Sequence, residues 1–313
     1  MSSRNISNLL DSAGYIAVLA VGMTLVIVIR HIDLSVGFAA GFLGAIAAIL
    51  LTQVGLPIYL TIPIILVLGV VVGLFNGVLV ASIGIPSFVA SLAGMLIFRG
   101  ALLQVTEKTG TIIIKDDNFN AIGNGFIPSI LQINGLHLLS LLVGLVGILL
   151  YIYSEISTRK SKIKYQFEVV SKGIFTLKLV MVSAIIAYIT WILAGYNGFS
   201  WTVVIMLLVV VVYHFLTTKT VLGRHIYAVG SNPEAAHLSG INVKKITYIV
   251  FGSMGMLAAL SGILFTSRLQ SATTTAGTLF ELDAIAAAYV GGVSSAGGVG
   301  KVTGAIIGAI VMA

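Results

Sequence analysis

Apolar segments of about 20 residues follow one another along almost the whole chain, and they constrain its fold more than any other feature. About 20 apolar residues in a helix span the hydrocarbon core of a bilayer. The segments lack the two-residue alternation of barrel strands. We therefore predict an all-α integral membrane protein, a polytopic helical bundle of about eight or nine spans. The eight clearest candidates are Ser12–Ile29, Val36–Leu51, Ile58–Ala81, Phe88–Val105, Leu136–Tyr153, Leu179–Ala194, Phe199–Leu216 and Ile246–Thr266.

The charge content agrees with lipid as the solvent. Only 9% of the residues are charged and 58% are hydrophobic, whereas a soluble domain has roughly 25% charged residues. The net charge of +7 does not indicate nucleic-acid binding, because six of the 17 basic residues lie between Arg159 and Lys178 and four between Lys219 and Lys245. Such clustering beside apolar segments follows the positive-inside rule. The absence of cysteine excludes disulfides and thiolate metal sites, and we predict no metal site.

The two basic segments set the predicted topology. We expect residues 154–178 to form a basic cytoplasmic loop and residues 218–245 a cytoplasmic coupling loop, since two spans separate them. Residues 1–313 then form a single transmembrane domain whose amino terminus lies outside. The last apolar stretch, Val302–Ala313, is too short to span. One hypothesis explains both ends: the sequence is part of a longer chain and lacks a helix at each end.

Two polar interruptions contain carboxylates. Asp33 and Ser35 lie between two predicted spans with almost no loop, either in a tight turn with an N-cap-like aspartate or in a broken helix that lines a wet cavity. Glu281 and Asp283 begin another apolar segment, where Thr278 has the spacing of a capping box with Glu281. This second group is expected on the outer side, either as plain capping or as the entry to a polar pathway.

Two further interruptions are rich in turn formers. Gly230–Gly240 predicts a helix of about two turns, with Ser231 and Glu234 as a capping box, Pro233 in the first turn and Gly240 at the end. A short helix is marginal alone, so we expect it to dock on a cytoplasmic partner; the alternative is a helix lying on the membrane surface. Gly291–Lys301 fails both phosphate-loop patterns and predicts a re-entrant turn between short apolar segments.

Small residues four positions apart predict three close helix contacts, because this spacing places them on one helix face. The three sets are Gly37, Gly41 and Ala45; Gly69, Gly73 and Gly77; and Gly300, Gly304 and Gly308.

Three motifs, in order along nearly the whole chain, resemble permease subunits of ABC-type monosaccharide importers of the ribose, xylose and galactose branch. They are Val21–Ile27 with Ile32–Gly37, Gly223–Gly230 with Glu234–Val243, and Phe280–Ala287 with the glycine-rich run that follows. The length of Ser154–Lys178 is most similar to the xylose or multiple-sugar permeases, as is the run Leu269–Thr273. The later Leu-Pro of the broader import-permease signature is absent.

The resemblance implies a bundle of about ten helices that acts as a pair of permeases with two cytoplasmic ATPase subunits and an extracytoplasmic sugar-binding protein. ATP binds to the partner subunits, and this chain is expected to bind no cofactor and to catalyse no reaction. The family's segment that docks on the ATPase falls on Glu234, Ala235, Ala236 and Gly240. The protein is expected in the bacterial cytoplasmic membrane.

Alternating access is the mechanism that this interpretation predicts. Asp33, Ser35, Glu281 and Asp283 are the candidates for lining the sugar pathway. The rival hypothesis is a secondary transporter driven by an ion gradient, with Asp33 as a proton or cation site. An intramembrane enzyme is a third class, but no catalytic motif supports it. Dependence on a partner ATPase distinguishes the first two.

Overall fold

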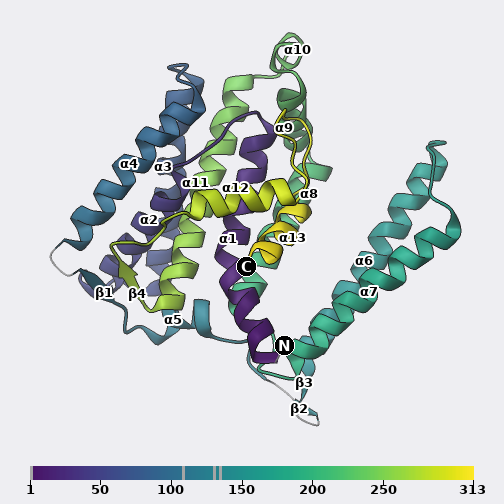
Figure 1. Cartoon of the computed structure of the whole chain (residues 1–313), viewed down its shortest axis with the longest axis horizontal. Helices are drawn as coiled ribbons and strands as arrows, with labels where there is room; N and C mark the ends of the chain where they lie inside the picture. The colour runs from purple at the N-terminus through teal and green to yellow at the C-terminus, as the bar shows by residue number, and fades with distance from the viewer. Residues whose placement is uncertain (1–2, 108–109, 130–131, 134–135) are drawn as a thin grey trace. The chain divides into compact units, whose positions relative to one another are not determined.

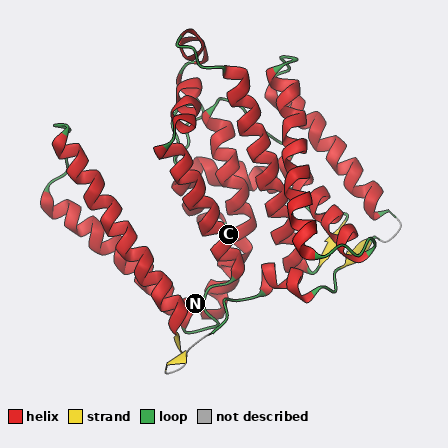
Figure 2. Cartoon of the chain, turned by 180° about the vertical axis from the view of Figure 1, so that it is seen from behind, coloured by secondary structure: helices red, strands yellow, loops and turns green. Residues whose placement is uncertain are grey.

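The computed structural model describes residues 3–107, 110–129, 132–133 and 136–313, and these residues are mostly helical (Figures 1 and 2). The helices are α1 (Ser3–Val28), α2 (Val36–Thr52), α3 (Ile58–Ala81), α4 (Ser87–Thr106), α5 (Asp117–Asn124), α6 (Leu138–Lys164), α7 (Lys172–Ala194), α8 (Trp201–Lys219), α9 (Val221–Ser231), α10 (Pro233–Leu238), α11 (Val243–Leu269), α12 (Phe280–Val290) and α13 (Val302–Met312). The strands are β1 (Thr111–Ile113), β2 (Gln132–Ile133), β3 (Leu136–His137) and β4 (Ser271–Thr273).

All eight predicted spans are helices, which confirms the predicted fold class. Among the described residues, seven helices are long and apolar enough to cross a membrane: α1, α3, α4, α6, α7, α8 and α11. The eighth, α2, has 17 residues and rises only about 25 Å, somewhat less than the hydrocarbon thickness. Helix α1 begins nine residues before its predicted start.

The chain forms two compact units, Met1–Asn8 with Phe126–Ser200 and Leu9–Gly125 with Trp201–Ala313. The second unit, called the core unit below, is built around α1, α2 and α11. In the apolar stretch of α1, 89% of the residues are buried, and in that of α11, 72%. The core unit therefore has helices shielded from lipid by their neighbours, which α3, α4 and α8 are not.

Helices α3 and α11 pack at backbone distance, as the predicted glycine ridge requires. A Cβ atom added to Gly69 would lie 2.5 Å from the carbonyl oxygen of Gly255, and one added to Gly73 would overlap the carbonyl oxygen of Phe251. No side chain fits there, so glycine is the residue that allows this contact.

The other two ridges also form contacts, although Gly300 lies before α13 and is not on its face as predicted. On α2, a Cβ atom at Gly41 would overlap the carbonyl of Ala276, in the segment before α12. On α13, Cβ atoms at Gly304 and Gly308 would overlap the carbonyls of Gly291 and Ala287. Because residue 291 faces 304 and residue 287 faces 308, α12 and α13 are antiparallel. The glycine-rich run is the turn between them, as predicted.

The first unit contains the hairpin of α6 and α7, whose helices pack against each other where Gly144 meets Thr190. Only 11% of the apolar stretch of α6 is buried, so most of its side chains face outward. The predicted loop 154–178 is mostly helical: α6 continues to Lys164 and α7 begins at Lys172. The lysine and arginine side chains tolerate helix well, and basic charge alone does not mark a loop.

The segment between α4 and α6 also has structure of its own. Strand β1 pairs antiparallel with β4, and the side chain of Asp116 caps α5 by accepting a hydrogen bond from the backbone N–H of Phe119. Phe119 is fully buried and anchors α5, which packs on α11.

Candidate functional site

The predicted docking helix exists as α10, a single short helix between α9 and α11 in the core unit (Figure 1). Its first turn contains Pro233 as predicted, but the capping residue is Asn232, not Ser231: the Asn232 side chain accepts hydrogen bonds from the backbone N–H groups of Glu234 and Ala235, both at 3.0 Å. Ser231 is still part of α9, where its hydroxyl donates to the carbonyl of Tyr227. The N-cap is therefore one residue later than predicted, which puts Glu234 at the second helical position, so the predicted capping box does not form.

Gly240 ends α10 as predicted, because its φ of 83° lies in the left-handed region that favours glycine. Its N–H donates to the carbonyl of His237, and the N–H of Ile241 donates to that of Ala236. This pair of bonds is a Schellman motif, with Gly240 just after the last helical turn. Both ends of α10 are thus fixed by local hydrogen bonds.

The side chains of α10 divide into an exposed and a buried set. Glu234, Ala235 and Gly240 are exposed, and so is Leu238, at 87%. Ala236 is only 4% exposed and faces the chain's own interior, so it anchors the helix rather than contacting another molecule. Leu238 was not among the predicted site residues, although a leucine at the end of a polar two-turn helix is the signal that identifies it. A separate hollow, to which Leu238 does not contribute, is lined by His237, Gly240 and the start of α11.

The predicted pathway residues Asp33 and Ser35 form a buried cluster at the start of α2. Both are 2% exposed. The Asp33 Oδ1 atom accepts hydrogen bonds from the Ser35 N–H at 2.9 Å and from the Ser35 hydroxyl at 2.6 Å. This is an aspartate turn in a non-helical connection, and it buries the carboxylate instead of turning it to water. Burial raises the pKa of the Asp33 carboxyl above its ordinary value, and the Ser35 hydrogen bonds oppose that rise.

Asn76 of α3 completes this cluster and was missed by the sequence analysis. Its Nδ2 atom donates to the Ser35 hydroxyl at 2.6 Å, while its Oδ1 atom is buried without a hydrogen-bond partner. A single amide within the 24 apolar residues of α3 was the available signal. A Cβ atom at Gly94 of α4 would lie 2.8 Å from that Oδ1 atom, so three helices meet here.

Glu281 also lies at the start of α2, because a Cβ atom at Gly37 would overlap its carboxylate. Glu281 is 4% exposed, and its Oε2 atom is buried without a hydrogen-bond partner. Asp283 is half-buried. The predicted capping by Thr278 is wrong: Leu279 is the N-cap with a φ of 67°, and the Thr278 hydroxyl donates to the carbonyl of Thr275 instead. Glu281 is thus buried among the helices of the core unit.

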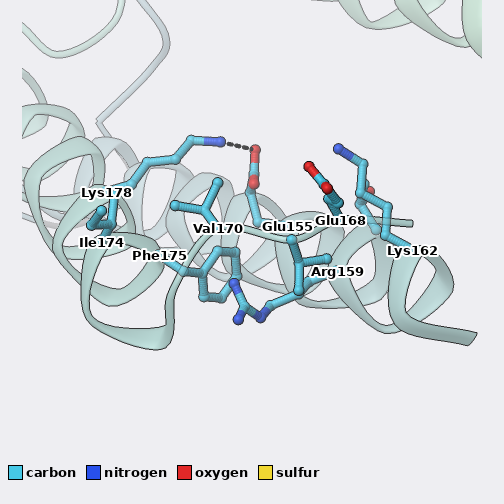
Figure 3. Close-up of a pocket in the computed structure, with 10 residues that line it drawn as sticks. Glu155, Arg159, Lys162, Glu168, Val170, Ile174, Phe175 and Lys178 are labelled. Atoms are coloured by element: carbon cyan, nitrogen blue, oxygen red, sulfur yellow. Dashed lines mark hydrogen bonds and ion pairs between the residues drawn. The ribbon is translucent and has the colours of Figure 1, made fainter. Parts of the chain in front are cut away.

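A charged pocket lies at the turn-proximal end of the α6–α7 hairpin in the first unit (Figure 3). Lys178 donates to Glu155 at 2.8 Å, and the Arg159 guanidinium stacks over the Phe175 ring at 4.5 Å. Lys162 and Glu168 line the same pocket. Its charges are of both signs and its ion pair is exposed to water, so we interpret the pocket as the solvated end of the hairpin and not as a binding site.

The comparisons with known proteins bear on the whole chain. The family model described as "branched-chain amino acid transport system / permease component" matches residues 5–313. The chain belongs to this permease family. The permease is 38% identical to the xylose transport system permease protein XylH of Escherichia coli, over all of this chain and 77% of that relative. It is also 38% identical to XylH of Haemophilus influenzae, over all of this chain and 81% of the relative.

A ribose relative is nearly as similar. The ribose import permease protein RbsC of Haemophilus influenzae is 35% identical, over 98% of this chain and 75% of the relative. No solved structure matches. With its candidate spans, the permease is a multi-pass protein of the cytoplasmic membrane, and its role is that of a transport component rather than an enzyme.

Proposed function

We propose that this permease is the membrane-spanning subunit of an ATP-driven importer of a monosaccharide, xylose or a related pentose or hexose. The xylose and ribose permeases among its relatives support the substrate class. Xylose comes first because the two xylose relatives have the higher identity. In such systems the separate sugar-binding protein largely sets selectivity, and it would deliver the sugar to the extracytoplasmic face.

The observation that carries the coupling to an ATPase is the geometry of α10. A helix of six residues is not stable by itself, yet this one is fixed at both ends by its Asn232 cap and its Schellman motif. Its Glu234 and Leu238 side chains are exposed, Leu238 at 87%, and are free to contact another protein. Covering an exposed leucine side chain with a partner would contribute about 1.5–3 kcal/mol of hydrophobic free energy to a protein–protein contact. The partner that fits is the cytoplasmic ATPase subunit, and ATP binds there.

The pathway that we propose for the sugar runs past the buried cluster at the start of α2. Asp33, Ser35, Glu281 and Asp283 are candidate lining residues, and Asn76 joins them. The Oδ1 atom of Asn76 and the Oε2 atom of Glu281 are buried acceptors without partners, which is costly in an apolar bundle. Sugar hydroxyls are donors that can satisfy such acceptors. The cluster would open to each side in turn as ATP drives alternating access.

The assembly would contain two copies of the permease, two ATPase subunits and the binding protein, in a lipid bilayer. The decisive experiment for the docking helix is co-purification of the detergent-solubilised permease with its ATPase, for wild type and for Leu238→Asp. The Leu238 side chain is almost free of intramolecular contact, so this change spares the fold. Thr218→Asp, which adds the same charge at the exposed end of α8, is the matched control.

We expect Leu238→Asp to weaken ATPase binding at least about tenfold, equivalent to about 1.4 kcal/mol, and Thr218→Asp to bind as wild type does. Glu234→Lys is expected to weaken binding less. Equal binding by wild type and Leu238→Asp would refute α10 as the docking helix. If the ATPase does not bind the wild-type permease at all, an ion-coupled carrier becomes the leading account.

A further inference from the structure

Three segments that are far apart in the sequence meet where α1 ends. They are the residues after α1, the carboxyl end of α9, and the glycine-rich turn between α12 and α13. The N–H of Gly298 donates to the carbonyl of Val28 at 2.8 Å, and the hydroxyl of Tyr227 in α9 donates to the carbonyl of Gly300 at 2.6 Å. We call this meeting point the α1–α9 junction.

Arg30 holds the junction together by its side chain. Its Nε atom donates to the carbonyl of Gly230 at 2.6 Å, and its Nη2 atom donates to the carbonyl of Ser231. These carbonyls end α9, where backbone acceptors have no helical partner and the helix dipole is negative. Helix α9 has no basic residue in its own last turn. The cation that caps it comes instead from a residue 200 positions earlier.

The three segments are packed so closely at their glycines that no side chain fits between them. A Cβ atom at Gly230 would overlap the carbonyl oxygen of Val28. One at Gly297 would overlap the Arg30 side chain, and one at Gly298 would lie 2.5 Å from the Ser231 hydroxyl. Contacts packed to this degree shift as a unit or rearrange, because they cannot deform continuously.

The junction links the docking helix to the candidate pathway. Helix α10 begins at Pro233. This is two residues after Ser231, the residue whose carbonyl accepts a hydrogen bond from Arg30. In the other direction, Arg30 is three residues before Asp33, and the glycine-rich turn leads back through α12 to Glu281. The junction therefore offers a path from α10 toward Asp33 on one side and toward Glu281 on the other.

We propose that Arg30 is the positioning residue that transmits movement of α10 to the start of α2 and to the α12–α13 hairpin. This inference rests on the proposed function, since it needs an ATPase on α10. Arg30 acts through the backbone carbonyls of α9 and touches neither ATP nor sugar. Its φ of 64° belongs to the Schellman motif that ends α1, in which the Arg30 N–H donates to the carbonyl of Ile27 and the His31 N–H to that of Val26.

The test uses the complete complex in proteoliposomes, with the ATPase, the binding protein and radiolabelled xylose. The quantity measured is the number of sugar molecules taken up per ATP hydrolysed, for wild type, Arg30→Gln, Arg30→Lys and Tyr227→Phe. A purely structural role would change the amount of assembled complex but not this ratio. Arg224→Gln is the matched control, because Arg224 is an exposed arginine of α9, the helix whose end Arg30 caps.

We expect Arg30→Gln to lower the ratio at least about fivefold, the lower limit of typical coupling between sites, while ATPase binding and basal hydrolysis persist. Arg30→Lys keeps the charge and should recover part of the ratio, and Arg224→Gln should match wild type. Tyr227→Phe removes one hydrogen bond of the junction and should lower the ratio slightly. Arg30→Lys lacks the planar guanidinium fork that donates to both carbonyls, so it serves as the test if Arg30→Gln does not assemble.

Unchanged ratios in assembled Arg30→Gln, or in Arg30→Lys if the former does not assemble, would overturn the role of Arg30 and leave the proposed function intact. If wild-type uptake does not depend on ATP, the proposed function fails and this inference fails with it.

Discussion

The α6–α7 hairpin and the α3–α11 contact have similar apolar sequences but opposite surroundings. In α6, 11% of the apolar stretch is buried, against 72% in α11. A Cβ atom at Gly147 of α6 meets nothing within 4 Å, whereas one at Gly73 of α3 would overlap the backbone of α11. Hydropathy thus identifies both as spans but cannot tell a lipid-facing helix from a core helix. The spacing of the small residues identifies the face through which α3 contacts α11, but not how much of a helix is buried, since only 28% of the apolar stretch of α3 is buried.

The charged residues of the two regions differ in the same way. The hairpin keeps its pair Glu155 and Lys178 in water, with the Lys178 side chain 52% exposed. The core unit buries Asp33 and Glu281 at 2% and 4% exposure. Exposed pairs contribute little to stability, while buried carboxylates in a membrane protein are costly and are a default sign of function.

The largest expected effect comes from a substitution in the contact between α3 and α11. Gly73→Leu should destabilise the permease by about 3 kcal/mol or more, because four side-chain carbons must displace the backbone of α11. Folded yield in detergent and the thermal midpoint measure this. Gly147→Leu introduces the same side chain into the hairpin, where space is open, and should change stability by less than about 0.5 kcal/mol. Equal losses in both variants would contradict the contrast.

A second comparison concerns transport. Glu281→Gln keeps the shape of the side chain but removes its charge, and we expect sugar uptake to fall about tenfold, equivalent to about 1.4 kcal/mol. Glu155→Gln in the hairpin should leave uptake unchanged. Both are measured as initial uptake rates at equal amounts of folded protein. Normal uptake by Glu281→Gln would remove this residue from the proposed pathway.

The smallest expected effect lies within the hairpin. Gly144 meets Thr190 closely, since a Cβ atom there would overlap the threonine side chain. Gly144→Ala should therefore cost about 1 kcal/mol, and Thr190→Ala should relieve part of that cost. A double-mutant cycle on thermal stability is expected to give a coupling of about 0.5 kcal/mol or more. Strict additivity would mean that the two helices do not pack at this point.

The sequence was sufficient for the spans and for α10, because long apolar runs and strong turn formers act locally. It placed the α10 cap on Ser231 rather than Asn232, since both residue types cap helices and they are neighbours. Thr278 had capping-box spacing, but Leu279 is the N-cap of α12, and the Thr278 hydroxyl donates to the carbonyl of Thr275 instead of capping the helix.

The contacts that the sequence did not reveal join distant segments. Asn76 meets Ser35 across 41 residues, and Arg30 meets Gly230 across 200. Spacing along one helix predicts that a face is small or polar, but it does not predict which other helix will meet that face. Those partners follow from the packing of the whole core unit.

The measurement that tests the account most directly is uptake of radiolabelled xylose by proteoliposomes containing the permease, with and without its ATPase and binding protein. We predict uptake only when both partners and ATP are present, and no response to a proton or sodium gradient. Uptake by the permease alone, driven by such a gradient, would contradict the account.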